Sequence, residues 1–193
     1  AGQMLMFTFP QIGNYGCDPK YYESSKIQVN ACLVKEWCRS PHQGKMNLDE
    51  WLKEEKIPGL EGIDTRQLTI ITREAGTLRA VICTDGKITP KQGVQRAKQM
   101  EWPSDSNLVS MVSTKRKYKR GTEGPKITLF DWGVKQSIVK NLAKICQVTV
   151  VPWNYDIEKI KATEPELVFM SNGPGDPDHE DMKPVVDTVK IIL

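Results

Sequence analysis

The sequence lacks the features that mark a disulfide-rich, membrane-spanning or strongly basic protein. Its five cysteines are scattered and include no C-x-x-C pair, so they indicate neither a disulfide framework nor a zinc site. We interpret them as reduced, mostly structural thiols. No window approaches the run of about 18 apolar residues that a membrane span needs. The 27 Lys and Arg against 24 Asp and Glu leave a net charge of +3, too small to indicate whole-chain binding to nucleic acid or membranes.

The composition is that of an ordinary globular protein. The chain has 193 residues, of which 39% are apolar and 26% charged, with a mean hydropathy of -0.44. These values exclude collagen-like, disordered and coiled-coil classes, and the length allows one or two domains. The stretch from Ala1 to Phe7 carries no basic leader and no small-residue cleavage site, so we expect no secretory signal and a cytoplasmic protein.

The first half of the chain predicts a mixed α+β arrangement. Alternating apolar and polar residues predict a strand over 27–33, and a further strand is predicted over 78–83. Two helices are predicted between them, because Asn47 and Asp64 are each followed three residues later by Glu or Gln, as in a capping box.

The stretch 101–126 predicts a connector between two domains, because Pro, Ser and Gly residues replace the regular pattern. A basic cluster in this stretch surrounds Tyr118 and consists of Lys115, Arg116, Lys117, Lys119 and Arg120. Such a cluster can contact phosphates or an acidic partner. We interpret it as a solvated linker, because single-strand binders interleave aromatic residues that are not found here.

From Ile127 onward, strands alternate with helices, which predicts a parallel, doubly wound sheet. Strands are predicted over 127–130, 148–151 and 167–170. A final helix carries its apolar residues on one face, namely Val185, Val186, Val189, Ile192 and Leu193. Nothing else in the sequence would cover this face or the sheet edge, so we expect other residues or another chain to complete the second domain.

The corner Gly173-Pro174-Gly175 follows the last predicted strand, at the carboxyl end where doubly wound folds bind ligands. Glycine removes steric bulk, proline stiffens the turn, and exposed N–H groups can donate to an oxyanion. By its spacing alone the corner more often only turns the chain, so both a binding site and a plain turn are compatible with it.

Several longer motifs extend this observation. The corner belongs to SNGPGDP at 171–177, and the other motifs are PQIGNYG at 10–16, ESS at 23–25, GIDTR at 62–66, REAGT at 73–77 and DWGVK at 131–135. SNGPGDP resembles the glycine-rich corner of class I glutamine amidotransferases, and the set as a whole resembles the small subunit of carbamoyl phosphate synthetase. The resemblance extends, with gaps, from Gly2 to about Pro177. It is specific, because the motifs of the first half belong to this subunit rather than to amidotransferases at large.

The resemblance implies an α/β fold class. It implies a mixed α+β N-terminal domain over 1–120 that lacks its first strands. The first half of a doubly wound three-layer α/β class I amidotransferase domain then follows over 125–193. On this basis we expect an internal fragment of the subunit.

The implied activity is glutamine hydrolysis. The ammonia passes to a large synthetase subunit, which makes carbamoyl phosphate from bicarbonate and ATP for the arginine and pyrimidine pathways. The expected partners are L-glutamine and that large subunit, in a heterodimer, with no nucleic acid and no membrane. No metal or other cofactor is expected on this chain, because ATP and Mg are used by the partner subunit.

The resemblance also implies roles for two site residues. The Gly173 backbone is expected to act as an oxyanion-hole donor, and Gly173 and Gly175 are expected to contact the substrate glutamine. This fits the chemistry, because a thiolate that attacks the side-chain amide builds negative charge on oxygen. The family's Cys, His and Glu triad lies beyond the matching part, as does a glutamine-binding serine of the opening strands. We therefore assign none of the five cysteines as nucleophile and expect the chain alone to be inactive.

The remaining polar clusters receive simpler interpretations. His42 and His179 have no partnered Cys or Ser at motif spacing, so both are interpreted as exposed loop histidines. The acidic residues around His179 are interpreted as a solvated loop and helix N-terminus rather than a cation site; they are Asp176, Asp178, Glu180 and Asp181.

Two other functions stay open. One is a non-catalytic interaction or regulatory fragment that docks on the synthetase subunit, which the missing nucleophile favours. The other is a different amidotransferase pathway, such as nucleotide or anthranilate synthesis. The GIDTR motif at 62–66 and the domain around it argue against the second, because those enzymes lack such a domain.

Overall fold

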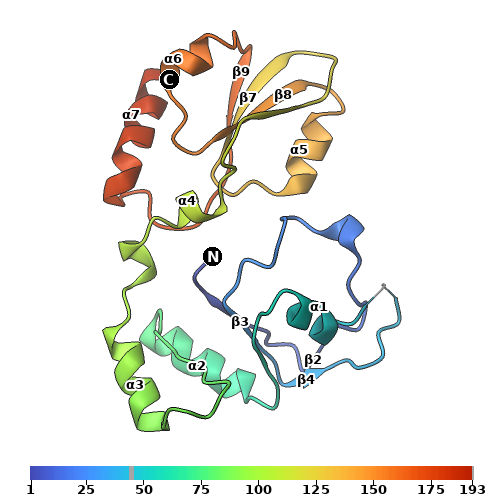
Figure 1. Cartoon of the computed structure of the whole chain (residues 1–193), viewed down its shortest axis with the longest axis vertical. Coiled ribbons are helices and arrows are strands. Elements are labelled where there is room, and N and C mark those ends of the chain that lie inside the picture. Colours follow the sequence, from blue (N-terminus) through green and yellow to red (C-terminus); the bar gives the residue numbers. More distant parts are fainter. Residues whose placement is uncertain (44–45, 193) are drawn as a thin grey trace. The chain divides into compact units, whose positions relative to one another are not determined.

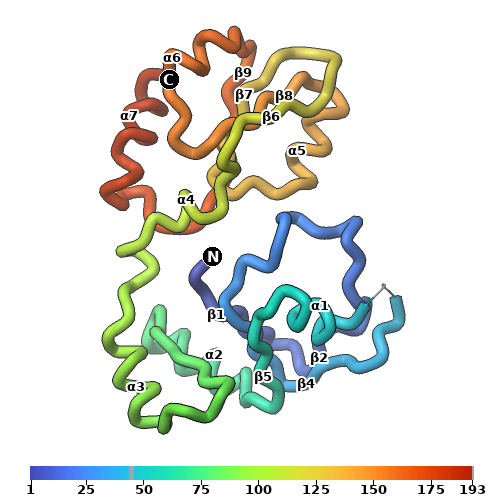
Figure 2. The backbone as a smooth tube through the Cα atoms, in the orientation of Figure 1, coloured from blue at the N-terminus to red at the C-terminus, as the bar shows by residue number. Residues whose placement is uncertain are grey.

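The computed structural model describes residues 1–43 and 46–192, which form two compact units. One unit holds Gly2–Trp102 and the other holds the chain from Pro103 onward. Figure 1 shows the elements of both units, and Figure 2 follows the backbone through them. Among the described residues, no helix is both long and apolar enough to cross a membrane.

The N-terminal unit contains two small parallel sheets. In the first, β3 (Ala31–Leu33) lies between β1 (Met4–Met6) and β5 (Gly59–Leu60), and in the second, β2 (Gln11–Ile12) pairs with β4 (Glu36–Trp37). A cluster of buried residues in this unit consists of Cys32, Val34, Trp37 and Leu52.

The helices of this unit are η1 (Pro19–Tyr21), α1 (Leu48–Glu54), α2 (Thr65–Ala75) and α3 (Pro90–Gln99). Both predicted helix starts are confirmed. The Asn47 side chain accepts a hydrogen bond from the N–H of Glu50 at 2.8 Å, and the Asp64 side chain accepts one from the N–H of Gln67 at 2.9 Å. These caps satisfy N–H groups that the first helical turn leaves unpaired.

The predicted strands of this unit are partly wrong. Only Ala31–Leu33 of the predicted strand over 27–33 is extended in a sheet, and 78–83 is irregular. Within the described residues, no strand pairs with 78–83, so its backbone has no ladder to join. Arg79 instead donates to the Met100 carbonyl at 2.7 Å and lies 4.3 Å from the centre of the Trp102 ring.

The C-terminal unit is built on one four-stranded sheet in the order β6-β8-β7-β9. Its strands are β6 (Tyr118–Arg120), β7 (Lys126–Asp131), β8 (Gln147–Pro152) and β9 (Leu167–Met170). β7, β8 and β9 are parallel, and β6 is antiparallel to β8. All three strands predicted from Ile127 onward are confirmed.

Helices cover both faces of this sheet (Figure 1). α5 (Gln136–Leu142) packs on the face that carries Leu129 and Val150, and α6 (Ile157–Lys161) and α7 (Lys183–Ile192) lie on the face that carries Phe130 and Val151. After β8 the chain crosses β7 to reach β9, so the winding direction reverses. The expected α/β fold class, doubly wound in this unit, is confirmed.

The two compact units divide between Trp102 and Pro103, which lies inside the predicted connector 101–126 but before the gap between the predicted domains 1–120 and 125–193. The segment that contains η2 (Pro103–Asp105), α4 (Leu108–Val112) and β6 lies in the C-terminal unit. Two contacts explain this, since Val109 packs against Met182 and Val185, and β6 pairs with β8. The basic cluster at 115–120 is solvated, as predicted, since its lysines and arginines are exposed, but it is not a linker, because Tyr118–Arg120 form an edge strand of this unit.

The last helix presents an incomplete apolar face. Val185 is buried, whereas Val186 is 37% exposed and Val189 and Ile192 are half-buried. Leu193, which was predicted on the same face, lies outside the described residues. α7 follows directly on η3 (Glu180–Met182).

Candidate functional site at the carboxyl ends of the parallel strands

The candidate site lies at the carboxyl ends of two neighbouring strands, β7 and β9. After β7 the chain passes to α5 on one face, and after β9 it passes to α7 on the other. Such a reversal leaves a crevice at the strand ends, which is where open α/β sheets bind ligands. Segment 171–177 follows β9, and Trp132 and Gly133 follow β7.

Asp131, the last residue of β7, fixes the loop that follows it. Its side chain is buried, and one oxygen accepts the N–H groups of Gly133 and Val134, both at 3.0 Å. The other oxygen accepts the N–H of Thr114 at 2.7 Å. A buried carboxylate with three donors is held in one position, so it fastens the β7 loop to the segment that follows α4.

Ser171 joins the β9 loop to the β7 loop. Its buried hydroxyl accepts the N–H of Trp132 at 3.0 Å and donates to the Asn172 carbonyl at 2.9 Å. The Trp132 indole N–H donates to the Trp153 carbonyl at 3.2 Å, which adds the end of β8 to the same network. The three strand ends are therefore connected by hydrogen bonds.

The glycines of the corner allow the two loops to approach each other closely. A Cβ added at Gly173 would lie 2.2 Å from the Trp132 carbonyl oxygen. Gly175 has φ +93°, a backbone conformation that residues other than glycine rarely adopt. Both positions therefore need glycine, Gly173 for its packing and Gly175 for its backbone conformation.

A cavity of about 380 Å³ adjoins the corner. Its lining combines backbone of the corner with apolar side chains from Val109, Trp132, Met182, Val185 and Val189. The sequence-predicted residues Gly173 and Gly175 both line it, and both are exposed. In the described part of the chain, their N–H groups donate to no protein acceptor, so they are free to donate to a ligand. Their roles in catalysis and substrate binding remain predictions.

Sequence reasoning missed the residues that hold this corner. Asp131 and Trp132 were noted only as part of a motif, and Ser171 only as a neighbour of the glycines. A polar residue at the end of a buried strand was the signal available for Asp131 and Ser171. Their hydrogen-bond partners come from other segments, which the sequence alone does not reveal.

The two histidines differ from each other. His42 is exposed, as predicted. His179 is not a free loop histidine, since its side chain is only 15% exposed and its Nδ1 accepts the N–H of Asp181 at 3.2 Å. It therefore caps η3, and the interpretation as an exposed loop residue was wrong. The neighbouring acidic residues 176, 178, 180 and 181 are exposed, which confirms a solvated acidic loop.

None of the five cysteines is among the residues that line the cavity at the corner. Cys17 and Cys32 are buried in the N-terminal unit, and Cys146 belongs to the core under α5. Cys38 is half-buried, and Cys83 is exposed with its thiol donating to Asp85 at 3.1 Å. All five are free thiols, and the burial of three of them fits the predicted structural role.

We expect a thiol reagent at about pH 8 to modify Cys83 first and to leave Cys32 unmodified until the protein unfolds. Burial raises the pKa of the Cys32 thiol to about 11, so little thiolate forms there. Mass spectrometry after timed labelling, in native buffer and in urea, measures the order. Because this pKa is raised in the folded state, the contribution of Cys32 to the free energy of unfolding is fully present below the ordinary thiol pKa of about 8.5. It is lost as the pH rises toward about 11. Early labelling of Cys32 in native buffer would contradict its burial.

The comparisons with known proteins agree on one family. Residues 1–82 match the model of the carbamoyl-phosphate synthase small chain, CPSase domain, and residues 128–192 match the model of class-I glutamine amidotransferase. The carbamoyl phosphate synthase small chain of Bacillus caldolyticus is 40% identical over 196 residues, which cover 100% of this chain and 52% of that protein. The Archaeoglobus fulgidus small chain is also 40% identical, over 98% of this chain and 53% of that protein.

The pyrimidine-specific small chain of Bacillus subtilis is 37% identical, over 100% of this chain and 52% of that protein. The chain thus spans about half the length of the curated relatives it matches. The two family models match the two compact units in turn, and the motifs at 10–16, 62–66 and 171–177 lie within the matched residues. The chain belongs to the carbamoyl phosphate synthase small-chain family.

Proposed function

We propose that this chain forms part of the glutamine-hydrolysing component of carbamoyl phosphate synthase and supplies the oxyanion-stabilising corner of the glutaminase site. The observation that carries the proposal is the corner at the carboxyl end of a doubly wound sheet, where the N–H groups of Gly173 and Gly175 have no acceptor among the residues that the structure describes. Membership of the small-chain family supports the choice of glutamine as substrate.

The chemistry of amide hydrolysis suits such a corner. When a thiolate attacks the glutamine side-chain amide, the carbonyl oxygen becomes negatively charged, and a fixed N–H at Gly173 would stabilise that charge. Asp131 and Ser171 act as positioning residues, because they hold the two loops that create the corner. No cysteine lines the cavity at the corner, and Cys146, the one cysteine of this unit among the described residues, is buried in the core under α5, so the proposal assigns none of the five as the nucleophile.

The rest of the proposal follows from the family. Ammonia released from L-glutamine would pass to a large synthetase chain, the heterodimeric partner, for the synthesis of carbamoyl phosphate in the arginine and pyrimidine pathways. In this proposal the large chain uses ATP and Mg, and the small chain holds no cofactor of its own. In this proposal, glutamine hydrolysis and carbamoyl phosphate synthesis take place in the cytoplasm.

We expect the native polypeptide that carries this sequence, purified with its large chain, to release glutamate and ammonia from glutamine. Chromatographic quantification of glutamate measures the reaction, and asparagine serves as the matched control substrate because it is one methylene shorter. An intact mass above 21.8 kDa would agree with a nucleophile outside this sequence. A complex that makes carbamoyl phosphate from free ammonia but never from glutamine would contradict the proposal.

A non-catalytic role is the second candidate, because no cysteine lines the cavity at the corner. In that case the native polypeptide would have a mass near 21.8 kDa and would bind the large chain without turning over glutamine. Co-purification of the two chains, measured together with the glutamate assay on one preparation, separates the two candidates.

A further inference from the structure

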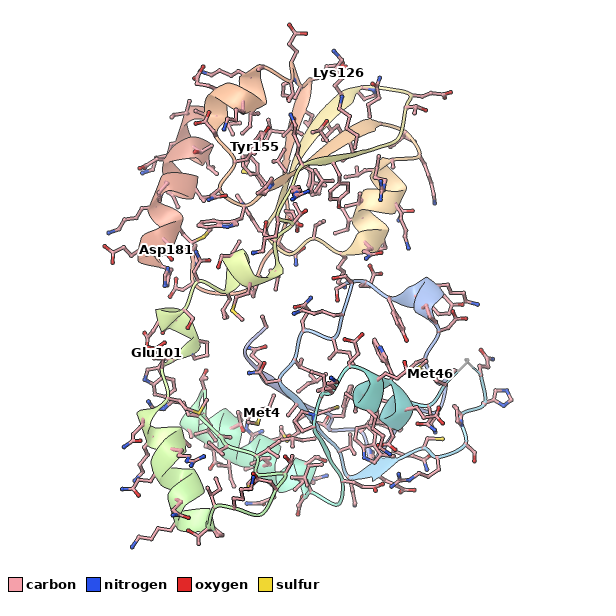
Figure 3. The ribbon with its side chains drawn as sticks, viewed as in Figure 1. Met4, Met46, Glu101, Lys126, Tyr155 and Asp181 are labelled. Carbon is pink, nitrogen blue, oxygen red and sulfur yellow. The ribbon has the colours of Figure 1, made fainter. Side chains whose placement is uncertain are left out.

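A second cavity lies at the opposite end of the C-terminal sheet from the glycine corner. Its volume is about 640 Å³, and it is formed where β7 and β8 begin, beside β6 and the loop that follows α6. Figure 3 labels Lys126, which marks this end of the sheet. The residues of its lining that matter here are Lys117, Lys119, Lys126, Thr149, Thr163 and Glu164.

The sheet face changes from apolar to polar at this cavity. β7 pairs Thr128 with Thr149 of β8, and β8 pairs Thr149 with Lys119 of β6, so these residues form one row across three strands. The next row toward the carboxyl ends holds the buried Phe130 and Val151. Neighbouring strands lie about 4.8 Å apart, which places Lys119 and Thr128 about 10 Å apart on one face.

The lining carries an excess of positive charge. The formal charge of the lining is 3 minus 1, or +2, from three lysines and one glutamate; they are Lys117, Lys119, Lys126 and Glu164. All three lysines are exposed, and in the part of the chain that the structure describes none of their ammonium groups is in an ion pair. Several unpaired ammonium groups at the rim of one concave surface attract anions.

The threonine hydroxyls of the cavity are not equivalent. Thr163 donates to the Ile160 carbonyl at 2.7 Å, so in the 3.0 Å contact between Thr128 and Thr163 the donor must be Thr128. Both of these protons are therefore used within the protein. Within the described residues, the half-buried Thr149 hydroxyl has no protein partner, so it is the one hydroxyl of the row that can donate to a ligand.

We propose that this cavity is an anion site that binds a small phosphate-bearing ligand through Lys117, Lys119, Lys126 and the Thr149 hydroxyl. A phosphate dianion matches the charge of +2, and lysine ammonium groups with a hydroxyl donor are suited to phosphate oxygens. The volume lies in the range of sites for small metabolites. Tyr118 is an aromatic residue of the lining, but its ring packs in the core under α5, so the site recognises the phosphate rather than a stacked base.

The test is a calorimetric titration of the native polypeptide with inorganic phosphate and, separately, with glycerol 2-phosphate, at constant ionic strength. The double variant Lys117→Gln/Lys119→Gln removes the two lysines of the edge segment. Lys140→Gln is the matched control, because it removes one exposed lysine from α5 on the other face of the sheet. Thr149→Val removes the free hydroxyl and keeps the shape of the side chain.

We expect saturable binding at one site that is at least about tenfold weaker in the double variant and about fivefold weaker in Thr149→Val, with Lys140→Gln unchanged. Tighter binding of glycerol 2-phosphate than of phosphate would identify a phosphomonoester as the ligand, and the reverse order would identify free phosphate. Non-saturable binding, or equal weakening by Lys140→Gln, would overturn the proposal. The site is separate from the glycine corner, so neither result bears on glutamine hydrolysis.

Discussion

Replacing Gly173 with alanine is expected to open the glycine corner and to remove most of the proposed glutaminase activity. The new Cβ would lie 2.2 Å from the Trp132 carbonyl oxygen and 3.0 Å from the Trp132 Cβ. Because the nearer atom belongs to the backbone, the loops after β7 and β9 must separate to admit it. We expect the free energy of unfolding to fall by about 1–3 kcal/mol. We also expect kcat/KM for glutamine to fall about 100-fold or more, as when an oxyanion donor is lost.

Gly93→Ala is the matched control for this substitution. Gly93 lies inside α3, and the nearest atom to an added Cβ is Ile88 Cδ1 at 3.9 Å, an ordinary contact. Alanine there should raise the free energy of unfolding by about 0.5–1 kcal/mol, because it restricts the unfolded chain and favours the helix. Urea unfolding and glutamate release are measured for both variants. A Gly173→Ala protein as stable and as active as Gly93→Ala would contradict the close approach of the two loops.

The sequence was most informative where the structure depends on local interactions. The strands over 127–130 and 148–151 were predicted correctly because they are short apolar runs buried on both faces by α5 and α6. The helix starts at Asn47 and Asp64 were predicted correctly because a cap involves only residues three positions apart.

Interactions between distant segments account for the errors. Residues 118–120 form a strand because β8, about 30 residues later, offers a free edge. Residues 78–83 are irregular because no strand of the described residues pairs with them. The glycine corner was identified through its motif. The importance of Asp131 was not, because one of its three donors is Thr114, which lies 17 residues earlier in a segment predicted as a connector.

This arrangement leads to the second large effect, expected for Asp131→Asn. One amide oxygen can still accept from Gly133 and Val134, but the amide NH2 group would then face the Thr114 N–H, which now lies 2.7 Å from a carboxylate oxygen. Two donors would point at each other in a buried site. The loss of one charge-assisted hydrogen bond and the desolvation of an unpaired N–H together cost about 2–4 kcal/mol.

Asp156→Asn is the matched control, because it makes the same chemical change at a surface helix cap. The exposed Asp156 side chain accepts the N–H groups of Glu158 and Lys159 at the start of α6, and asparagine is an equally good residue at that position. We expect it to change the free energy of unfolding by less than about 0.5 kcal/mol.

Urea unfolding measures the global effect, and hydrogen exchange of the Thr114, Gly133 and Val134 amides measures the local one. Faster exchange of these amides in Asp131→Asn alone is the expected result. Equal losses of unfolding free energy in Asp131→Asn and Asp156→Asn would contradict the prediction. They would show that stability depends on a negative charge near a strand or helix end rather than on the buried carboxylate that holds the corner.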